Sequence, residues 1–242
     1  MFNLEQTIRD QLSDGSTDCC FGEPMKNHTT FRVGGPARVF VSPGDEEELR
    51  KIIRICREND VDYIILGNGS NLLVSDNGYE GVVISLGKGW SYCRTEVTGL
   101  VAGGAVSLAT AARKAREQSL SGLEFAAGIP GTVGGALVMN AGAYGSEIKD
   151  VLKRASVMAK EGQILRLEAE DLALGYRTSC ILERGYVVLE AEFELTPGDG
   201  EAIGARMQEP VSYTHLHKGK GSVCVGLCGR YGQYDGGDYP AD

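Results

Sequence analysis

GNGSNLL at residues 67–73 and AAGIPGTVGGA at residues 126–136 are the stretches that decide the fold of this chain. The first follows Tyr63–Leu66, a compact apolar run typical of a buried strand. Glycines let a chain turn with positive φ, and successive N–H groups in such a turn form a concave anion site. Taken alone, these residues predict a phosphate-binding loop and a tight β-turn about equally well.

The first glycine-rich loop differs from the two common nucleotide fingerprints. No Gly-Lys-Ser/Thr follows it, as a Walker loop requires, and only its Gly-Asn-Gly resembles the first half of the dinucleotide pattern GxGxxG. The Ser and Asn that follow would add side-chain donors to those of the backbone. The residues expected to hold a cofactor here are Gly67, Asn68, Gly69, Ser70, Asn71 and Leu72.

The second glycine-rich loop runs directly into MNAGAYG at residues 139–145. So many small residues in one run allow a planar ligand or its phosphates to lie against the backbone. The alternative is a crossing of a helix and a strand in which the small residues serve packing alone. The residues expected to contact a cofactor here are Gly128, Gly131, Thr132, Gly134 and Gly135.

Composition and charge restrict the partners. The chain of 242 residues is 42% apolar and 24% charged, the balance of an ordinary globular protein with one large or two small domains. Its net charge of −9 argues against a broad surface for nucleic acid or an anionic membrane. No stretch approaches the ~20 apolar residues of a membrane span, and seven irregularly spaced cysteines favour reduced thiols. We therefore expect a soluble cytoplasmic protein with a small-molecule ligand.

The periodicity of the apolar residues predicts two α/β units. In the first, over residues 38–86, helical spacing and an acidic first turn predict a helix at 45–59 between strands. In the second, Ser107 is expected to cap a helix that stops near Gly122. A hairpin over 151–167 and a further alternating strand follow.

These patterns divide the chain into four segments. We predict an N-terminal segment at 1–22, a first subdomain at 23–90, a second at 91–198, and a linker with an atypical tail at 199–242. After Pro210 glycine recurs without helical or strand periodicity, so the structural boundary is expected near that residue.

Four motifs occur in order along the chain: NHTTFRVGGPA at 27–37, the two glycine-rich loops, and LGYRTS at 174–179. Together they resemble the UDP-N-acetylenolpyruvoylglucosamine reductase family of flavoenzymes, over roughly residues 23–210. The resemblance implies an α+β fold of the vanillyl-alcohol-oxidase type. In that fold two α/β subdomains clamp FAD, and a third subdomain covers the substrate.

The resemblance also implies a reaction. NADPH reduces the bound FAD, which then reduces a UDP-sugar, UDP-N-acetylglucosamine enolpyruvate, in peptidoglycan precursor synthesis. Arg177 matches the family's active-site arginine, whose planar fork suits a substrate carboxylate as enolate charge develops. The alternative for Arg177 is an ordinary surface ion pair. Tyr144 and Tyr176 are expected either near the ligand or in the core.

The sequence departs from the family after Pro210. The serine segment that supplies the family's proton donor has no clear counterpart there, and only Ser222 resembles it. No glutamate follows Glu209, although the family has one in its third subdomain. We therefore expect a truncated form of the reductase. The alternatives are an FAD-binding module without turnover and another oxidoreductase of the same fold.

The tail allows one further alternative, a zinc site. His215, His217, Cys224 and Cys228 are four suitable ligands, although the His-x-His pair precedes the cysteines, unlike the familiar finger order. We expect instead an irregular Gly-rich tail with incidental cysteines, and we assign no metal. The oligomeric state is left open.

Overall fold

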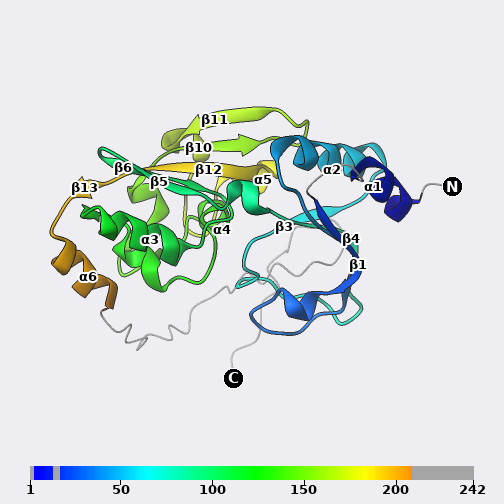
Figure 1. Cartoon of the computed structure of the whole chain (residues 1–242), viewed down its shortest axis with the longest axis horizontal. Helices are drawn as coiled ribbons and strands as arrows, with labels where there is room; N and C mark the ends of the chain where they lie inside the picture. The colour runs from blue at the N-terminus through cyan, green and yellow to red at the C-terminus, as the bar shows by residue number, and fades with distance from the viewer. Residues whose placement is uncertain (1–2, 13–16, 209–242) are drawn as a thin grey trace, which may run out of the picture.

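The computed structural model describes residues 3–12 and 17–208, and two sheets lie side by side in it (Figure 1). The elements of the first sheet and its helices are α1 (Leu4–Leu12), β1 (Asp18–Pro24), β2 (Pro36–Ser42), α2 (Glu46–Glu58), β3 (Tyr63–Leu66) and β4 (Tyr79–Ser85). The strands lie in the order β1-β2-β4-β3. β2, β3 and β4 are parallel, whereas β1 is antiparallel to β2. This is the α/β unit predicted over 38–86, extended by α1 and β1.

The helix predicted at 45–59 is confirmed as α2. The Asp45 side chain caps it by accepting a hydrogen bond from the Glu48 N–H, with Oδ1 and N 2.9 Å apart. Its predicted apolar stripe is buried and consists of Leu49, Ile52, Ile53 and Cys56. The same apolar cluster contains Met158, Val187 and Leu189, which belong to the second sheet. α2 therefore packs against both sheets and joins them.

The second sheet is antiparallel. Its strands and the helices around it are β5 (Cys93–Glu96), β6 (Gly99–Gly103), α3 (Leu108–Glu117), α4 (Val133–Val138), β10 (Leu152–Met158), β11 (Ile164–Glu168), α5 (Cys180–Arg184) and β12 (Val187–Glu194). The strand order is β11-β10-β12-β6-β5. α3 and α4 bury their apolar residues against one face. The predicted hairpin is confirmed as β10–β11, and the alternating strand as β12.

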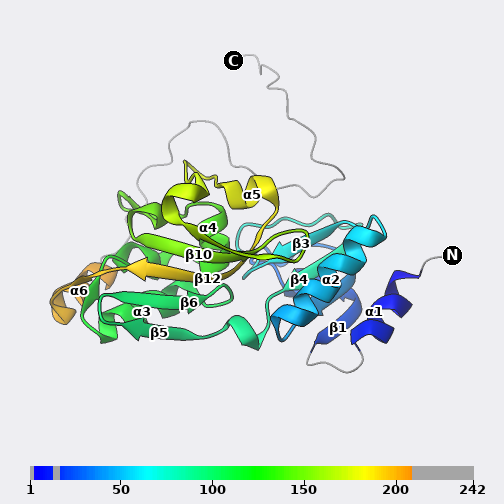
Figure 2. The same cartoon turned by 90° about the horizontal axis from the view of Figure 1, so that it is seen from above.

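Shorter elements complete the described chain. Four two-residue strands form two small sheets: β7 (Leu120–Ser121) with β13 (Thr196–Pro197), and β8 (Gly142–Ala143) with β9 (Ser146–Glu147). Single 3-10 turns are η1 (Met25–Asn27), η2 (Lys88–Trp90), η3 (Glu124–Gly128), η4 (Ile148–Asp150) and η5 (Ala169–Leu172). The last helix, α6 (Gly200–Gln208), packs on η3 and α3 at the end of the molecule distant from the first sheet (Figure 2).

The prediction that Gly122 ends the helix begun at Ser107 is wrong. Ser107 does cap α3, but the helix ends at Glu117, where the Gln118 N–H donates to the carbonyls of Ala115 and Arg116. Gly122 lies beyond β7 and has a φ of +132°, so it serves a turn after the strand. A glycine signal locates a turn but does not say which element precedes it.

The predicted segment boundaries stay predictions, but two contacts bear on them. β1 crosses the position between residues 22 and 23 and pairs with β2 along its length. α6 lies within 199–242, yet its Ile203 is buried and its Arg206 forms an ion pair with Glu124 (NH2 to Oε1 2.6 Å). α6 therefore packs against the second sheet's helices, although it lies beyond the predicted boundary at residue 198.

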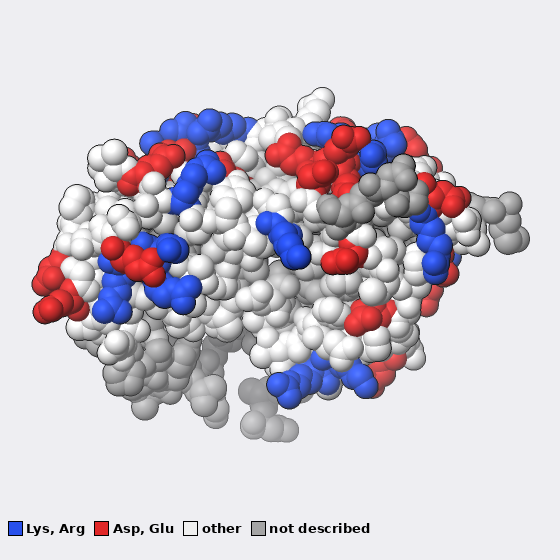
Figure 3. Space-filling model, viewed as in Figure 1, with Lys and Arg blue, Asp and Glu red and all other residues white. Residues whose placement is uncertain are grey.

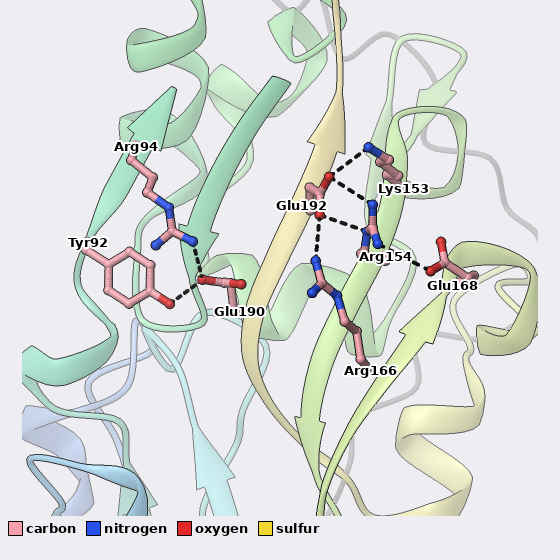
Figure 4. A network of polar contacts seen from close by, with 8 residues as sticks. All are labelled: Tyr92, Arg94, Lys153, Arg154, Arg166, Glu168, Glu190 and Glu192. Atoms are coloured by element: carbon pink, nitrogen blue, oxygen red, sulfur yellow. Dashed lines mark hydrogen bonds and ion pairs between the residues drawn. The ribbon is translucent and has the colours of Figure 1, made fainter. Parts of the chain in front are cut away.

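The face of the second sheet opposite α3 and α4 carries a polar network (Figure 4). Glu192 on β12 pairs with Lys153 (2.9 Å) and Arg154 (2.8 Å) of β10 and with Arg166 (3.2 Å) of β11. The hydrogen bond from Lys153 holds the pKa of Glu192 below its usual value, against the opposing effect of burial. These contacts tie three adjacent strands together, so the network serves the sheet.

A second group of polar contacts lies toward the sheet edge, around Glu190 (Figure 4). Its carboxylate accepts a hydrogen bond from Tyr92 (2.6 Å) and pairs with Arg94 (3.1 Å). Burial and the bond to Glu190 raise the pKa of Tyr92 to about 12. On the face shown in Figure 3, acidic and basic side chains lie among one another in the same way. The net charge of −9 forms no single acidic patch there.

Candidate functional site

The structure brings the two glycine-rich loops into contact. The Ser70 hydroxyl donates a hydrogen bond to the Pro130 carbonyl (2.8 Å), and the Asn71 amide lies 3.1 Å from the Met139 sulfur. A Cβ added to Gly67 would lie 2.6 Å from the Thr132 hydroxyl oxygen, so a side chain at Gly67 would separate the loops. The loops belong to different halves of the structure, and these contacts bring them together in one candidate site.

The 27–37 motif holds the first loop from its other side. The Thr30 N–H donates to the Gly69 carbonyl (3.0 Å). Gly69 has a φ of +61°, and an added Cβ would overlap the carbonyl oxygen of His28. Only glycine fits this position, because both the backbone conformation and the space exclude a side chain. The first loop thus lies between the 27–37 motif and the second loop.

The first loop leaves backbone donors open. Within residues 3–12 and 17–208, the N–H groups of Asn68, Gly69 and Ser70 donate to no protein acceptor. Backbone donors are strong hydrogen-bonding groups, and nearly all of them find a partner in a folded protein or in what it binds. Consecutive open N–H groups next to glycines are the arrangement that receives phosphate oxygens.

The second loop uses most of its backbone donors internally. The Val133 N–H donates to the Val106 carbonyl (2.8 Å), and the Gly134 N–H donates to the Gly104 carbonyl (2.9 Å). The Gly135 N–H donates to the Thr132 hydroxyl oxygen (3.2 Å), which makes Thr132 the N-cap of α4. In the described chain only Gly131 and Thr132 keep an open N–H in the 131–135 segment.

A pocket of about 450 Å³ opens beside the first loop. The 27–32 segment forms one wall, and Gly67 and Asn68 form part of the other. The His28 ring stacks on Phe40, with centroids 4.2 Å apart, and its Nε2 lies 2.9 Å from a Glu23 carboxylate oxygen. The pocket is therefore lined by Asn68, one of the three residues with an open N–H group, and by the fixed imidazole of His28.

Arg177 lies at the tip of a tight turn. Gly175 and Thr178 exchange backbone hydrogen bonds of 3.1 and 3.4 Å across the turn, and Arg177 has a φ of +56°. Its guanidinium lies 5.9 Å from the centroid of the Tyr176 ring. No acidic side chain of the described residues pairs with it, so the structure does not show the surface ion pair that was the alternative for Arg177.

The interpretation of Tyr144 and Tyr176 as core residues is wrong. Their exposed fractions are 60% and 88%, because each stands in a tight turn whose tip points to solvent. Tyr144 has a φ of +56° in the β8–β9 turn, and Tyr176 precedes Arg177 in the second turn. No motif pointed to Asn140, a buried residue with a φ of +44°. Its amide donates to Glu147 beside the first turn and to Gly175 in the second.

The other candidates from the sequence are a proton donor and a zinc site, both in the tail. Ser222 and the four possible zinc ligands lie outside the described residues. Within those residues no group of three or more His, Cys, Asp or Glu is arranged to hold a metal ion. The five described cysteines are free, and burial raises the pKa of the Cys56 thiol to about 12. None of the described helices is both long enough and apolar enough to span a bilayer.

The residues present fit a phosphorylated dinucleotide such as FAD. The open N–H groups of the first loop suit its phosphates, which need several short-range donors. Gly131 has a φ of +152°, and an added Cβ would meet only the Ser70 hydroxyl at 3.6 Å. Space is therefore left above the backbone where the two loops meet, as a planar ring system requires.

Comparison with known proteins points to the same ligand. The FAD binding domain family matches residues 37–168, which is more than half of the chain. The UDP-N-acetylenolpyruvoylglucosamine reductase of Clostridium novyi (strain NT) is 49% identical over 185 residues, covering 76% of this chain and 60% of that protein. The reductase of Exiguobacterium sibiricum is 44% identical over 207 residues, covering 86% and 67%.

Solved structures confirm the expected α+β FAD-binding fold. UDP-N-acetylenolpyruvylglucosamine reductase from Thermus caldophilus is 33% identical, with a TM-score of 0.68 over 80% of this chain and 67% of that one. The Physcomitrella patens BBE-like 1 protein is 16% identical with a TM-score of 0.57, a likeness of fold alone. The chain spans about three fifths of the length of the first curated relatives it matches, which it covers to 60%, 63% and 62%.

Proposed function

This chain belongs to the UDP-N-acetylenolpyruvoylglucosamine reductase family, and on that premise we propose that it is the flavin-binding portion of an FAD-dependent reductase. The proposed reaction uses NADPH to reduce UDP-N-acetylglucosamine enolpyruvate to UDP-N-acetylmuramate. The observation that carries the proposal is the row of open N–H groups at Asn68, Gly69 and Ser70, held beside the second glycine-rich loop. Peptidoglycan precursor synthesis, with its effects on cell shape and division, and a cytoplasmic location are part of the same proposal.

The proposed cofactor contacts follow from the donors that remain open. The first loop binds the phosphates of FAD through the N–H groups of Asn68, Gly69 and Ser70. Gly131 and Thr132 of the second loop supply the other open N–H groups, while Gly134 and Gly135 give close approach without a free donor. When bound, FAD supplies the hydride transfer that no side chain of the protein performs.

Arg177 is the proposed substrate-binding cation. An exposed guanidinium without an acidic partner in the described chain is available to a carboxylate, which it binds through two parallel N–H groups. The same charge stabilises the enolate that develops when the double bond is reduced. Ser222 is the proposed proton donor in the tail. If turnover is present, an unchanged rate in Ser222→Ala removes it from that role.

The cofactor and the reaction are tested by one sequence of measurements on the purified full chain. After addition of FAD and removal of unbound flavin, the protein is expected to keep the flavin absorption band. NADPH should bleach that band under anaerobic conditions, and the enolpyruvyl substrate should restore it. A protein that takes up no FAD would contradict the proposed cofactor.

A second candidate function is FAD binding without turnover, favoured by the three-fifths share of the relatives' length that this chain covers. The same measurements separate the two candidates. Flavin that NADPH reduces but the substrate does not reoxidise indicates the binding module. Reoxidation by an unrelated acceptor, with none by the enolpyruvyl substrate, would indicate another oxidoreductase of this fold.

Arg177→Ala tests the substrate contact. We expect the FAD affinity to change less than twofold and the substrate affinity to fall by about tenfold to a hundredfold, the loss of one charge-assisted pair. Titration with FAD measures the first affinity, and titration of the flavin spectrum with substrate measures the second. Arg184→Ala is the matched control, because Arg184 also lies 5.9 Å from a tyrosine ring but outside this turn. An equal loss in both variants would contradict the assignment.

A further inference from the structure

Asn140 is the residue that connects the second glycine-rich loop to the turn bearing Arg177. It lies two residues beyond the end of α4, is 2% exposed and has a φ of +44°. Its amide nitrogen donates to a Glu147 carboxylate oxygen (2.8 Å) and to the Gly175 carbonyl (3.1 Å). Its amide oxygen accepts from the Lys149 N–H (2.9 Å). Both donor hydrogens and the acceptor of this amide are therefore used.

We infer that Asn140 is a positioning residue for Arg177, an inference that rests on the proposed function of Arg177. Gly175 begins the turn, and its carbonyl accepts hydrogen bonds from both the Thr178 N–H and the Asn140 amide. No other side chain of the described residues contacts the turn through that carbonyl. Asn140 thus fixes the base of the turn, and Arg177 stands at its tip.

A second anchor lies on the other side of the same turn. The Ser179 hydroxyl, 1% exposed, donates to the Val138 carbonyl at the end of α4 (2.7 Å). α5, which begins at the next residue, packs beside α4 (Figure 2). Because Thr132 caps the start of α4, the short helix links the open end of the second loop to both anchors. The turn and the second loop are therefore connected through α4.

Arg177 depends on these anchors more than a buried residue would. Its side chain has no hydrogen-bond or ion-pair partner among the described residues, and only the Tyr176 ring lies beneath it. The direction of its guanidinium is consequently set by the backbone of the turn. A shift of about 1 Å in a group that binds a reacting substrate is enough to cost a large factor in binding and rate.

The chemistry of position 140 selects asparagine. Asparagine tolerates the left-handed backbone better than most residues. Aspartate has nearly the same shape but lacks both donor hydrogens, and it would place a second carboxylate beside Glu147. Glycine suits the backbone but has no side chain to reach Gly175. Asn140→Asp and Asn140→Gly therefore remove the anchor in two independent ways, the second without backbone strain.

The experiment combines hydrogen exchange with ligand titration on the full chain. In both variants we expect the amides of Gly175 and Thr178, which are hydrogen-bonded across the turn, to exchange about tenfold faster, while the first sheet is unchanged. FAD affinity should stay within twofold, and affinity for UDP-N-acetylglucosamine enolpyruvate should fall about tenfold. In the Arg177→Ala background, Asn140→Asp should cause no further loss of substrate affinity, because the two residues act through one contact.

Asn59→Asp is the matched control. The Asn59 amide donates to the Ile55 carbonyl (2.8 Å) at the end of α2, in the other half of the molecule. It should leave the exchange of the Gly175 and Thr178 amides and the substrate affinity unchanged. A protein that binds no FAD at all would contradict the proposed function, whereas the exchange measurement needs no flavin and still tests the anchor.

Two results would overturn the inference. One is unchanged exchange of the Gly175 and Thr178 amides in both Asn140 variants. The other is faster exchange spread evenly over the second sheet, or a loss of substrate affinity that adds fully to that of Arg177→Ala, since either would make Asn140 a general stabiliser. If Asn140→Asp does not fold, Asn140→Gly decides by the same readings. If neither variant folds, Asn140 is a general stabiliser and the inference fails.

Discussion

The two glycine-rich loops are alike in composition but use their backbone N–H groups in opposite ways. The 67–73 loop leaves three consecutive N–H groups without an acceptor in the described chain, and it is held by its carbonyl and side-chain groups instead. The 128–135 loop spends the N–H groups of residues 133–135 on Val106, Gly104 and its own Thr132. Glycine content alone therefore does not separate a cradle for a ligand from a crossing between two segments of backbone.

The second loop was open to two interpretations, a contact with a ligand and a crossing of backbone segments, and its two halves differ in this respect. Its C-terminal half is a small-residue crossing, because a Cβ on Gly134 would come within 3.0 Å of the Gly104 carbonyl. Its N-terminal half keeps the features of a ligand contact, with open N–H groups at Gly131 and Thr132. Counting each backbone donor separates the residues whose N–H groups bond to Gly104 and Val106 from those whose N–H groups stay open.

Gly69→Ala is expected to have the largest effect on the first loop. Both the positive φ and the overlap with the His28 carbonyl oppose a side chain, so we expect a loss of about 2 kcal/mol or more in the free energy of unfolding. FAD affinity should fall about a hundredfold, because the open N–H groups move with the loop. Urea unfolding and flavin titration measure the two effects.

Gly128→Ala is the matched control in the second loop. A Cβ at Gly128 would meet nothing within 4 Å, and its φ is not positive. We expect stability to change by less than about 0.5 kcal/mol, so a loss of FAD affinity there would come from the ligand contact expected at Gly128 and not from a displaced loop. A loss of stability in Gly128→Ala as large as that in Gly69→Ala would contradict the steric difference between the two positions.

Much of the fold could be predicted from local patterns. α2 and the β10–β11 hairpin have clear periodicity, and the structure places a capping residue, Asp45, before the helix and a glycine, Gly162, in the hairpin turn. β1 was not predicted, because Asp18–Pro24 has weak alternation and gains its partner only from β2. Such an edge strand is specified by tertiary contact, which no local window contains.

The site was predictable in its parts but not in its connections. The motifs pointed to both loops and Arg177, yet the acceptors of the second loop's N–H groups, Gly104 and Val106, lie 30 and 27 residues away in sequence. Asn140 reaches Gly175 across a separation of 35 residues. Hydrogen-bond accounting needs these long-range partners, so a sequence pattern cannot distinguish an open donor from an occupied one.

Thr132→Ala tests the N-cap in the second loop. The change removes the acceptor for the Gly135 N–H and should cost about 1 kcal/mol of stability, the usual value of an N-cap. Because the open donors of the first loop remain, FAD affinity should fall less than tenfold, far less than in Gly69→Ala. Thr132→Ser keeps the hydroxyl and should restore the stability. If serine does not restore it, the cap is not the cause.

The smallest expected effect concerns the support of the first loop by Glu23 and His28. The hydrogen bond from His28, followed by that from Asn27, holds the pKa of the Glu23 carboxyl below its usual value of 4.5. A lowered folded-state pKa means that ionised Glu23 stabilises the fold above pH 4.5, and that this contribution is lost as the pH falls through the folded-state value.

The test compares unfolding free energies at pH 6 and pH 4 in the wild type and in Glu23→Gln. The glutamine keeps an acceptor for His28 but does not titrate in this range, so it should remove less than about 1 kcal/mol of the acid-dependent loss. Glu80→Gln is the control, because Glu80 is exposed on β4 and pairs with no described cation. FAD affinity should follow the same pH trend, because the His28 carbonyl lies against Gly69. An identical acid response in Glu23→Gln and the wild type would show that the first loop does not depend on this pair.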